Sequence, residues 1–271
     1  MMKRTIALCV MCAFIALILP AISEAAQWTY PLAANLLENK NGNLVLANRE
    51  NLLDEDFVPN NLVSLSLRGV DGPHELRREA ADALYELFRT AEQDGFLLYI
   101  KSSYRSYQTQ NTMYRNRLEK YGRDDGVVAY PGSSDHQTGL GVDVLNRDWA
   151  KRDGMTPAFG NTDEAKWIEA HCADFGFILR YLPEKQDVTG IIYEPWHLRY
   201  LGRDAAKYIM DKRLSLEEFA AEYQGAIARY EAAGGDFQAL CQKLNALPEA
   251  VTLKTADESG DPEVSLFYET P

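Results

Sequence analysis

The stretch from Ser134 to Asp143 constrains the fold more than any other, because it joins a histidine to an aspartate across a glycine-bearing turn. The apolar residues from Leu140 to Leu145 follow this turn and predict a buried strand with Asp143 inside it. His136 precedes the strand by a few residues, so its side chain can reach the same region as the aspartate. Histidine nitrogens and carboxylate oxygens are both common zinc ligands, and the stretch therefore predicts half of a metal site.

The other half of such a site must come from elsewhere in the chain, where few histidines are available. The histidines are His74, His136, His171 and His197. His74 and His171 fall on predicted helices without a carboxylate at a useful spacing, and we expect them to be surface or cap residues. His197 follows Glu194 by three residues and is the best candidate. Taken alone, a histidine beside a tryptophan in an apolar segment is also typical of a buried core residue, so both interpretations stay open at this point.

A catalytic zinc site usually has three protein ligands, leaves a fourth position for water and keeps a carboxylate nearby as a base. His136, Asp143 and His197 would supply the ligands, and Glu194 would be the base. Arg105 lies just beyond a second predicted strand, where it could stabilise negative charge on a substrate. In a chain with excess acid, Arg105 could equally be a structural ion-pair partner.

Three separated motifs mark a resemblance to a known family. They are Ser103-Tyr104-Arg105-Ser106-Tyr107 with Gln110, then Ser134-x-His136-x-x-Gly139-x-Gly141-x-Asp143, and finally Glu194-Pro195-Trp196-His197-Leu198-Arg199-Tyr200. In these motifs, and in their order, the chain closely resembles the zinc D-alanyl-D-alanine carboxypeptidases of the VanY type, which are LAS-like zinc peptidases. The resemblance extends from about Leu44 to about Phe219.

The resemblance implies a role for each matching position of the metal site. His136, Asp143 and His197 match the ligands of a single Zn²⁺ ion. Glu194 matches the catalytic base, and Arg105 matches the arginine credited with stabilising the transition state.

Ser134 and Gln110 match family positions near the substrate. The chain departs from the family at Gly141, where alanine is usual. Both residues are small, so we expect altered packing and backbone stiffness there rather than lost chemistry.

The activity implied by the resemblance is removal of the terminal D-alanine from peptidoglycan stem peptides that end in D-Ala-D-Ala. A D-Ala-D-Ala dipeptidase and a cell-wall endopeptidase of the same fold are alternatives, and so is a non-catalytic cell-wall binding module. Export argues against the dipeptidase, whose free dipeptide substrate is cytoplasmic. The presence of Glu194 beside all three ligands argues against the binding module.

The expected architecture is α+β, with a small central antiparallel sheet flanked by helices, like that of the hedgehog and D-Ala-D-Ala peptidase fold. The antiparallel pairing is implied by the resemblance. Hydrophobic periodicity predicts helices over 71–93, 108–121, 163–175, 205–211, 216–230 and 236–247, and strands over 44–47, 96–100, 140–145, 177–181 and 196–200.

The domain organisation follows from composition along the chain. We expect a signal peptide over 1–26, an Asn-rich linker over 27–43, the catalytic domain over 44–232, and a C-terminal helix with a partly ordered tail over 233–271. Lys3 and Arg4 precede an apolar run shorter than the roughly 20 residues of a spanning helix, which is typical of a cleaved secretory signal. The expected location is therefore extracytoplasmic, on the cell-wall or periplasmic side, with anchoring by an uncleaved signal as the alternative.

The net charge of −12 argues against a nucleic-acid partner, which would require clustered lysine and arginine. The expected partner is the stem peptide, and we expect a monomer. Signal cleavage would leave Cys172 and Cys241, either as a disulfide or as two buried thiols.

Overall fold

The computed structural model describes residues 26–152 and 154–246. The predicted signal peptide, apart from its last residue, and the predicted tail beyond residue 246 lie outside this range. Within the described ranges, no helix combines the length and the apolar composition that a membrane span requires.

A four-stranded antiparallel sheet forms the centre of the fold, as the resemblance implied. Its strands in spatial order are β3 (Leu98–Ser102), β4 (Gly141–Asn146), β6 (His197–Tyr200) and β5 (Phe177–Leu179). A separate two-stranded sheet pairs β1 (Leu62–Ser64) with β2 (Glu75–Arg77). Every residue of β4 except the last is buried, which agrees with its apolar sequence.

Two predictions at the N-terminal side of the sheet were wrong. The apolar segment 44–47 forms no strand, because Arg199 Nη2 donates to the carbonyls of Asn43 (3.0 Å) and Val45 (2.6 Å), where a strand partner would otherwise bond. The helix expected from residue 71 begins only at Arg78. Leu76 fits the helical spacing, but it is the central residue of β2 and pairs with β1.

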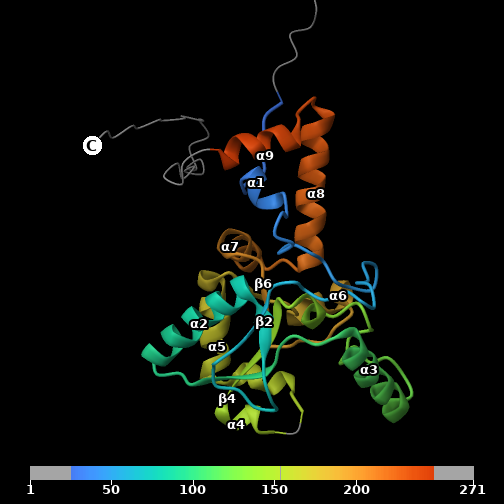
Figure 1. Cartoon of the computed structure of the whole chain (residues 1–271), viewed down its shortest axis with the longest axis vertical. Helices are drawn as coiled ribbons and strands as arrows, with labels where there is room; N and C mark the ends of the chain where they lie inside the picture. Colours follow the sequence, from blue (N-terminus) through green and yellow to red (C-terminus); the bar gives the residue numbers. More distant parts are fainter. Residues whose placement is uncertain (1–25, 153, 247–271) are drawn as a thin grey trace, which may run out of the picture.

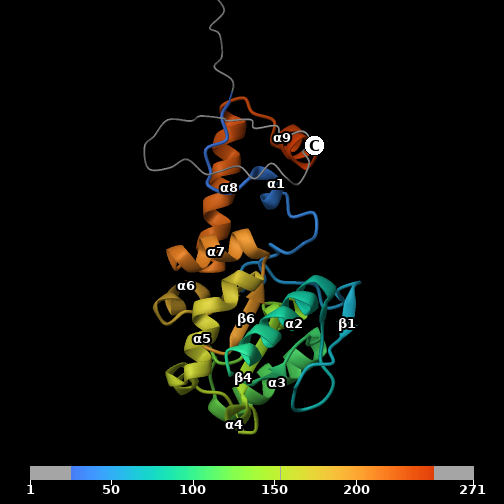
Figure 2. The same ribbon diagram turned by 90° about the vertical axis from the view of Figure 1, so that its left-hand side faces the viewer.

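The helices surround the sheet and extend beyond it (Figure 1). They are α1 (Ala34–Leu37), α2 (Arg78–Gln93), α3 (Tyr107–Tyr121), α4 (Arg147–Ala150), α5 (Asp163–His171), α6 (Gln186–Thr189), α7 (Arg203–Lys212), α8 (Leu216–Ala232) and α9 (Phe237–Asn245). A 3₁₀ turn, η1 (Asp135–Thr138), leads into β4. In Figure 1, helices α2 and α5 lie on one side of the sheet and α3 lies on the other, and Figure 2 views the molecule from the side of α2 and α5.

The main hydrophobic core lies between α2, α5 and one face of the sheet. Leu84 and Phe88 of α2 pack there with Val142 and Val144 of β4 and with Leu198 of β6. All five side chains are buried, so this face of β4 and β6 packs against the helices and is not open to a ligand. The opposite face is left for polar side chains.

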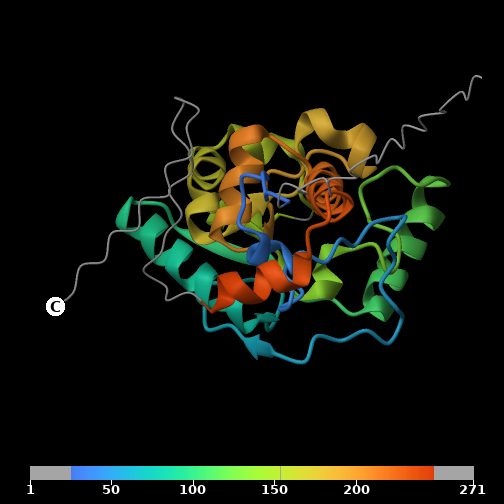
Figure 3. The same ribbon diagram turned by 90° about the horizontal axis from the view of Figure 1, so that it is seen from above.

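A second core joins the two ends of the described chain. Residues 27–43 differ from the linker that their asparagines predicted, because Trp28 packs against Tyr230 and Phe237 with ring centroids 5.7 and 5.6 Å apart. Helix α1 packs against α9 beside α8, and Figure 3 shows α9 in red crossing above α1 in blue. The aromatic residues of this segment, rather than its asparagines, determine its packing.

Helix α8 begins with the capping box that the sequence predicted. Ser215 Oγ accepts from the backbone N–H of Glu218 (3.1 Å), and the Glu218 carboxylate accepts from the N–H of Ser215 (2.7 Å). Cys172 and Cys241 are buried free thiols and lie in different cores, so the alternative with two thiols holds in this structure.

Candidate functional site

The register between β4 and β6 brings the two central polar residues together. Asp143 pairs directly with His197, and Gly141 pairs with Arg199. Directly paired residues in an antiparallel sheet project from the same face, while Val142 and Leu198 between them project into the main core. The face opposite α2 therefore carries an aspartate, a histidine and an arginine in adjacent positions.

His136 reaches this face from η1. Its Nδ1 lies 2.6 Å from the carbonyl oxygen of Ser103, which can only accept, so Nδ1 carries the proton. The other ring nitrogen, Nε2, is then free to donate its lone pair, and it lies 3.3 Å from Asp143 Oδ2. Among the described residues, His136, Asp143 and His197 form a buried group whose ligand atoms all lie within 4.8 Å of one another.

His197 supplies the second imidazole of this group. Its Nδ1 lies 2.9 Å from Asp143 Oδ1, and its Nε2 is buried without a hydrogen-bond partner among the described residues. Two imidazoles and one carboxylate are a donor set that zinc accepts, and three protein ligands leave a position open for water. The residues present therefore fit a zinc ion held by His136 Nε2, Asp143 and His197 Nδ1.

The electrostatics of the group favour metal binding. Burial alone would raise the pKa of Asp143, but His136 and His197 hold it well below its usual range, so the carboxylate is ionised. Burial would lower the pKa of His197, but the carboxylates of Asp135 and Asp143 raise it to about 9. A metal ion at His197 Nδ1 must therefore displace a proton at neutral pH.

Glu194 precedes β6 and lies beside the group without belonging to it. Its Oε2 is 3.8 Å from His197 Nδ1, and its backbone N–H donates to the carbonyl of Tyr181 (3.1 Å), which fixes the position of its backbone. Burial raises the pKa of Glu194 to about 8, against the opposing effect of His197. A carboxylate in this position can both accept and return a proton near neutrality.

Arg105 and Gln110 are hydrogen-bonded to each other and lie in the same cavity as the group. Arg105 donates from Nη1 to Gln110 Oε1 (2.7 Å) and from Nη2 to Ser102 Oγ (2.9 Å), and Gln110 Nε2 donates to the carbonyl of Ala129 (2.6 Å). Gln110 thus fixes the guanidinium in the cavity wall.

One cavity joins all the predicted site residues. Its volume is about 150 Å³. The predicted residues in its wall are Arg105, Gln110, Ser134, His136, Asp143, Glu194 and His197. Ser134 lies in this wall and is 3% exposed.

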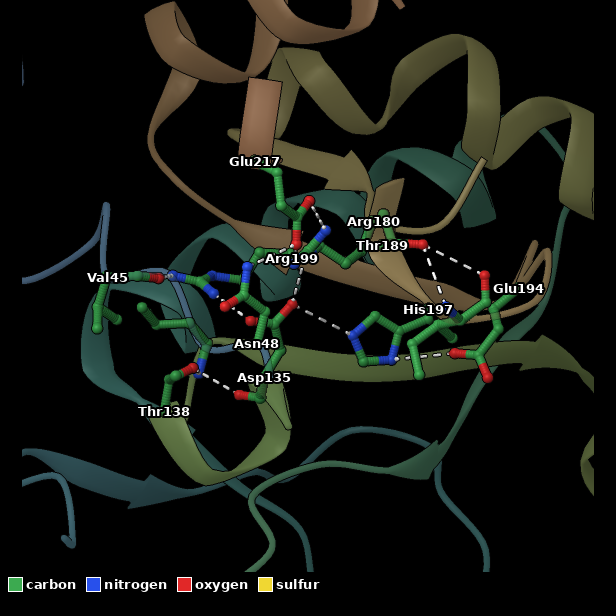
Figure 4. Close-up of polar contacts among 12 residues, drawn as sticks. Val45, Asn48, Asp135, Thr138, Arg180, Thr189, Glu194, His197, Arg199 and Glu217 are labelled. Carbon is green, nitrogen blue, oxygen red and sulfur yellow. Dashed lines mark hydrogen bonds and ion pairs between the residues drawn. The ribbon is translucent and has the colours of Figure 1, made fainter. Parts of the chain in front are cut away.

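Sequence reasoning missed Asp135, which is fully buried between two arginines. Its Oδ2 accepts from Arg180 Nε (2.9 Å), its Oδ1 accepts from Arg199 Nη1, and Oδ2 also lies 3.9 Å from His197 Nε2 (Figure 4). Burial alone would raise the pKa of Asp135, but the two arginines hold it well below its usual range. The only sequence signal was an acidic residue between the serine and histidine of the central motif.

The remaining histidines differ from each other. The expectation of a surface or cap residue was wrong for His74, which is 8% exposed and whose ring nitrogens lie 3.2 Å from Ser103 Oγ and 2.9 Å from the carbonyl of Val70. His171 is the last residue of α5, and its side chain is 44% exposed, as expected.

Comparisons with known sequences agree on one family. The sequence profile described as VanY: D-alanyl-D-alanine carboxypeptidase matches residues 73–203. The putative carboxypeptidase YodJ of Bacillus subtilis (strain 168) is 39% identical over 189 residues, which cover 68% of this chain and 68% of that protein. A D-alanyl-D-alanine carboxypeptidase of Enterococcus faecalis is 30% identical over 187 residues, covering 65% of each.

Solved structures give the same result. The LdcB LD-carboxypeptidase is 38% identical with a TM-score of 0.62, over 68% of this chain and 88% of that one. VanYB in complex with D-alanine-D-alanine is 30% identical with a TM-score of 0.56, over 66% and 98%. A VanY variant in complex with Zn(II) is 29% identical with a TM-score of 0.54, over 66% and 98%.

Zinc affinity is predicted to depend on pH through His197. Because its pKa is raised to about 9, the metal must displace one proton below that pH, and the apparent affinity should rise by up to about tenfold per pH unit from pH 6 to 9. Competition with a fluorescent chelator measures this slope. A constant affinity between pH 7 and 9 would contradict the account.

The substitution Gly141→Ala is predicted to disturb the packing of the turn η1 on β4. A Cβ at this position would lie 3.0 Å from the carbonyl carbon of Asp135 and 3.1 Å from the backbone nitrogen of His136. These are buried backbone atoms, so we expect a loss of about 1–3 kcal/mol in the free energy of unfolding, measured with urea.

The control for this prediction is Gly225→Ala in α8. A Cβ there meets the end of the flexible Arg229 side chain at 3.2 Å, so helix propensity should make the change neutral or stabilising by up to about 1 kcal/mol. Equal stability of Gly141→Ala and the wild type would refute the close packing of the loop on β4.

Proposed function

This chain belongs to the VanY family of D-alanyl-D-alanine carboxypeptidases, and on that premise we propose that it is a zinc-dependent enzyme that removes the terminal D-alanine from peptidoglycan stem peptides. The observation that carries the proposal is the buried group of His136, Asp143 and His197 in one cavity with Glu194. The solved VanY variant binds Zn(II), and VanYB binds D-alanine-D-alanine.

His136 Nε2, Asp143 and His197 Nδ1 are the proposed zinc ligands. The proton that His136 Nδ1 donates to Ser103 supports the use of its Nε2, and the 2.9 Å distance from His197 Nδ1 to Asp143 supports the use of that nitrogen. When bound, zinc would supply Lewis acidity, which lowers the pKa of water and polarises a carbonyl group.

Glu194 is the proposed general base and acid. It takes the proton from the attacking water and returns it to the amine of the departing D-alanine. Its raised pKa, about 8 from burial, supports both transfers, since the carboxyl can exist in either form near neutral pH. Among the described residues that line the cavity, the only other carboxylate is that of Asp143, which lies between the two histidines and is not free for this role.

Arg105 is proposed to bind negative charge on the substrate, which at the scissile bond is the developing oxyanion. Its guanidinium is anchored by Gln110 and Ser102, so little reorganisation accompanies the reaction. Gln110 acts by holding Arg105, and Ser134 is proposed to contact the substrate from the cavity wall.

A second candidate is an L,D-carboxypeptidase, which removes D-alanine from an L-residue at the end of a tetrapeptide. The LdcB LD-carboxypeptidase has a higher TM-score and identity to this chain than VanYB has, which favours this candidate. This chain is also 33% identical over 180 residues to VanXYC of Enterococcus gallinarum, a bifunctional D-Ala-D-Ala dipeptidase and D-Ala-D-Ala carboxypeptidase. Dipeptidase activity is therefore a further candidate.

The cellular setting is also part of the proposal. A signal peptide over 1–26 would export the protein to the side of the membrane where peptidoglycan lies. The proposed catalytic domain is 44–232, and the enzyme is proposed to act as a monomer on the stem peptide alone.

The function is tested with three substrates and mass spectrometry of the products. The zinc-loaded protein should release one alanine from a synthetic pentapeptide ending in D-Ala-D-Ala, and a strong chelator should abolish the release. Faster cleavage of the matching tetrapeptide would favour the L,D-carboxypeptidase, and cleavage of free D-Ala-D-Ala would favour the dipeptidase. An intact pentapeptide with fully zinc-loaded protein would overturn the proposal.

The substitution Glu194→Gln is predicted to lower kcat by at least about 10²-fold, because the amide cannot accept the proton of water. Zinc content should remain that of the wild type, since Glu194 is not a proposed ligand. Glu184→Gln is the matched control, because this carboxylate pairs with Arg213 at the surface and should leave activity unchanged. Wild-type kcat in Glu194→Gln would rule out Glu194 as the base.

A further inference from the structure

Each of the two imidazoles of the metal group has one nitrogen that faces away from it. In His136 this nitrogen is Nδ1, and it donates to a neutral backbone carbonyl. In His197 it is Nε2, which is buried and has no hydrogen-bond partner among the described residues. A buried polar atom of this kind is rare in folded proteins unless a partner approaches in another state of the site.

The nearest ionised group to this nitrogen is Asp135. Its Oδ2 lies 3.9 Å from His197 Nε2, which is too long for a hydrogen bond and short enough to become one after a small shift of the ring. Asp135 itself cannot move far, because Arg180 and Arg199 hold its two oxygens and the group is 0% exposed. The carboxylate is thus a fixed acceptor that faces the Nε2 side of the His197 ring.

The sheet register explains why two arginines and a histidine meet at one carboxylate. The backbone N–H of Arg180 donates to the carbonyl of His197, so these two residues lie opposite each other where β5 ends and β6 begins. Arg199 is two residues after His197 on β6, so its side chain projects from the same face as that of His197. The turn η1 packs closely over this face, since a Cβ at Gly141 would lie 3.0 Å from the carbonyl carbon of Asp135 and 3.1 Å from the backbone nitrogen of His136. Asp135, the first residue of η1, therefore lies above Arg180, His197 and Arg199 together.

We propose that Asp135 is a positioning residue for the metal site, accepting a hydrogen bond from His197 Nε2–H and so presenting Nδ1 to the metal ion. When a metal ion binds His197 Nδ1, the proton of Nδ1 would be released to solvent, and the proton on Nε2 would remain. A carboxylate acceptor at that nitrogen fixes the tautomer, orients the ring and makes Nδ1 a stronger donor. The inference rests on the proposed zinc ligands and requires no particular peptide substrate.

Arg180 also connects Asp135 to α8. Arg180 donates to both oxygens of Glu217 (2.8 and 2.6 Å), the second residue of α8, so Arg180 is shared between two carboxylates (Figure 4). Glu217 does not contact His197. It therefore provides a control of equal charge on the same arginine.

The test compares Asp135→Asn with Glu217→Gln by chelator competition at a fixed pH. If Asp135 positions His197, Asp135→Asn should weaken zinc binding by about 10- to 100-fold, while Glu217→Gln should stay within about threefold of the wild type. A role limited to balancing the charge of Arg180 would weaken both variants alike and would overturn the proposal. Unchanged affinity in Asp135→Asn would overturn it as well.

A second measurement needs no variant and covers the case in which Asp135→Asn fails to fold. In the zinc-loaded wild type with ¹⁵N-labelled histidine, the Nε2–H of His197 should give a downfield proton signal protected from exchange, with Nδ1 bound to metal. Metal bound to Nε2, or a rapidly exchanging Nε2–H, would overturn the proposal. Both measurements omit substrate, so a protein that binds zinc in this way but spares the pentapeptide would refute only the proposed function.

Discussion

The buried carboxylate of Asp135 holds the site together, because it joins three segments that are distant in the sequence. It bonds to Arg180, which directly follows β5, and to Arg199 on β6, and it faces the ring of His197. Arg199 also binds the carbonyls of residues 43 and 45, and Arg180 binds Glu217 of α8. Removing one member of a buried charged group leaves the others uncompensated, so this network is costly to break.

The two faces of the sheet have different roles, one in packing and one in the site. Val142, Val144 and Leu198 bury one face against α2 and α5, and this packing stabilises the sheet. The other face carries Asp143 and His197 in direct register, so the distance between them follows from strand pairing rather than from flexible loops. A site on paired strands is held more precisely than one on loops, which suits a metal whose ligands must converge on one point.

Sequence patterns predicted the parts of the fold that depend on local information. Periodicity and motifs predicted the strands that contain Asp143 and His197, the capping box at Ser215, and the grouping of the three residues that could hold a metal ion. The failures had non-local causes. Segment 44–47 bonds to Arg199 instead of a strand, and His74 is buried because Ser103 meets it from another segment. Asp135 could not be interpreted because its partners lie on β6 and directly after β5, and the sequence does not reveal the spatial order of these strands.

The central claim is that one zinc ion binds between β4, β6 and η1, with Asp135 behind His197. Anomalous diffraction at the zinc absorption edge, from crystals of the zinc-loaded protein, tests it most directly. We predict one peak per chain within bonding distance of His136 Nε2, a carboxylate oxygen of Asp143 and His197 Nδ1, with His197 Nε2 within hydrogen-bond distance of Asp135. A peak bonded to His197 Nε2, or one located away from these three residues, would contradict it.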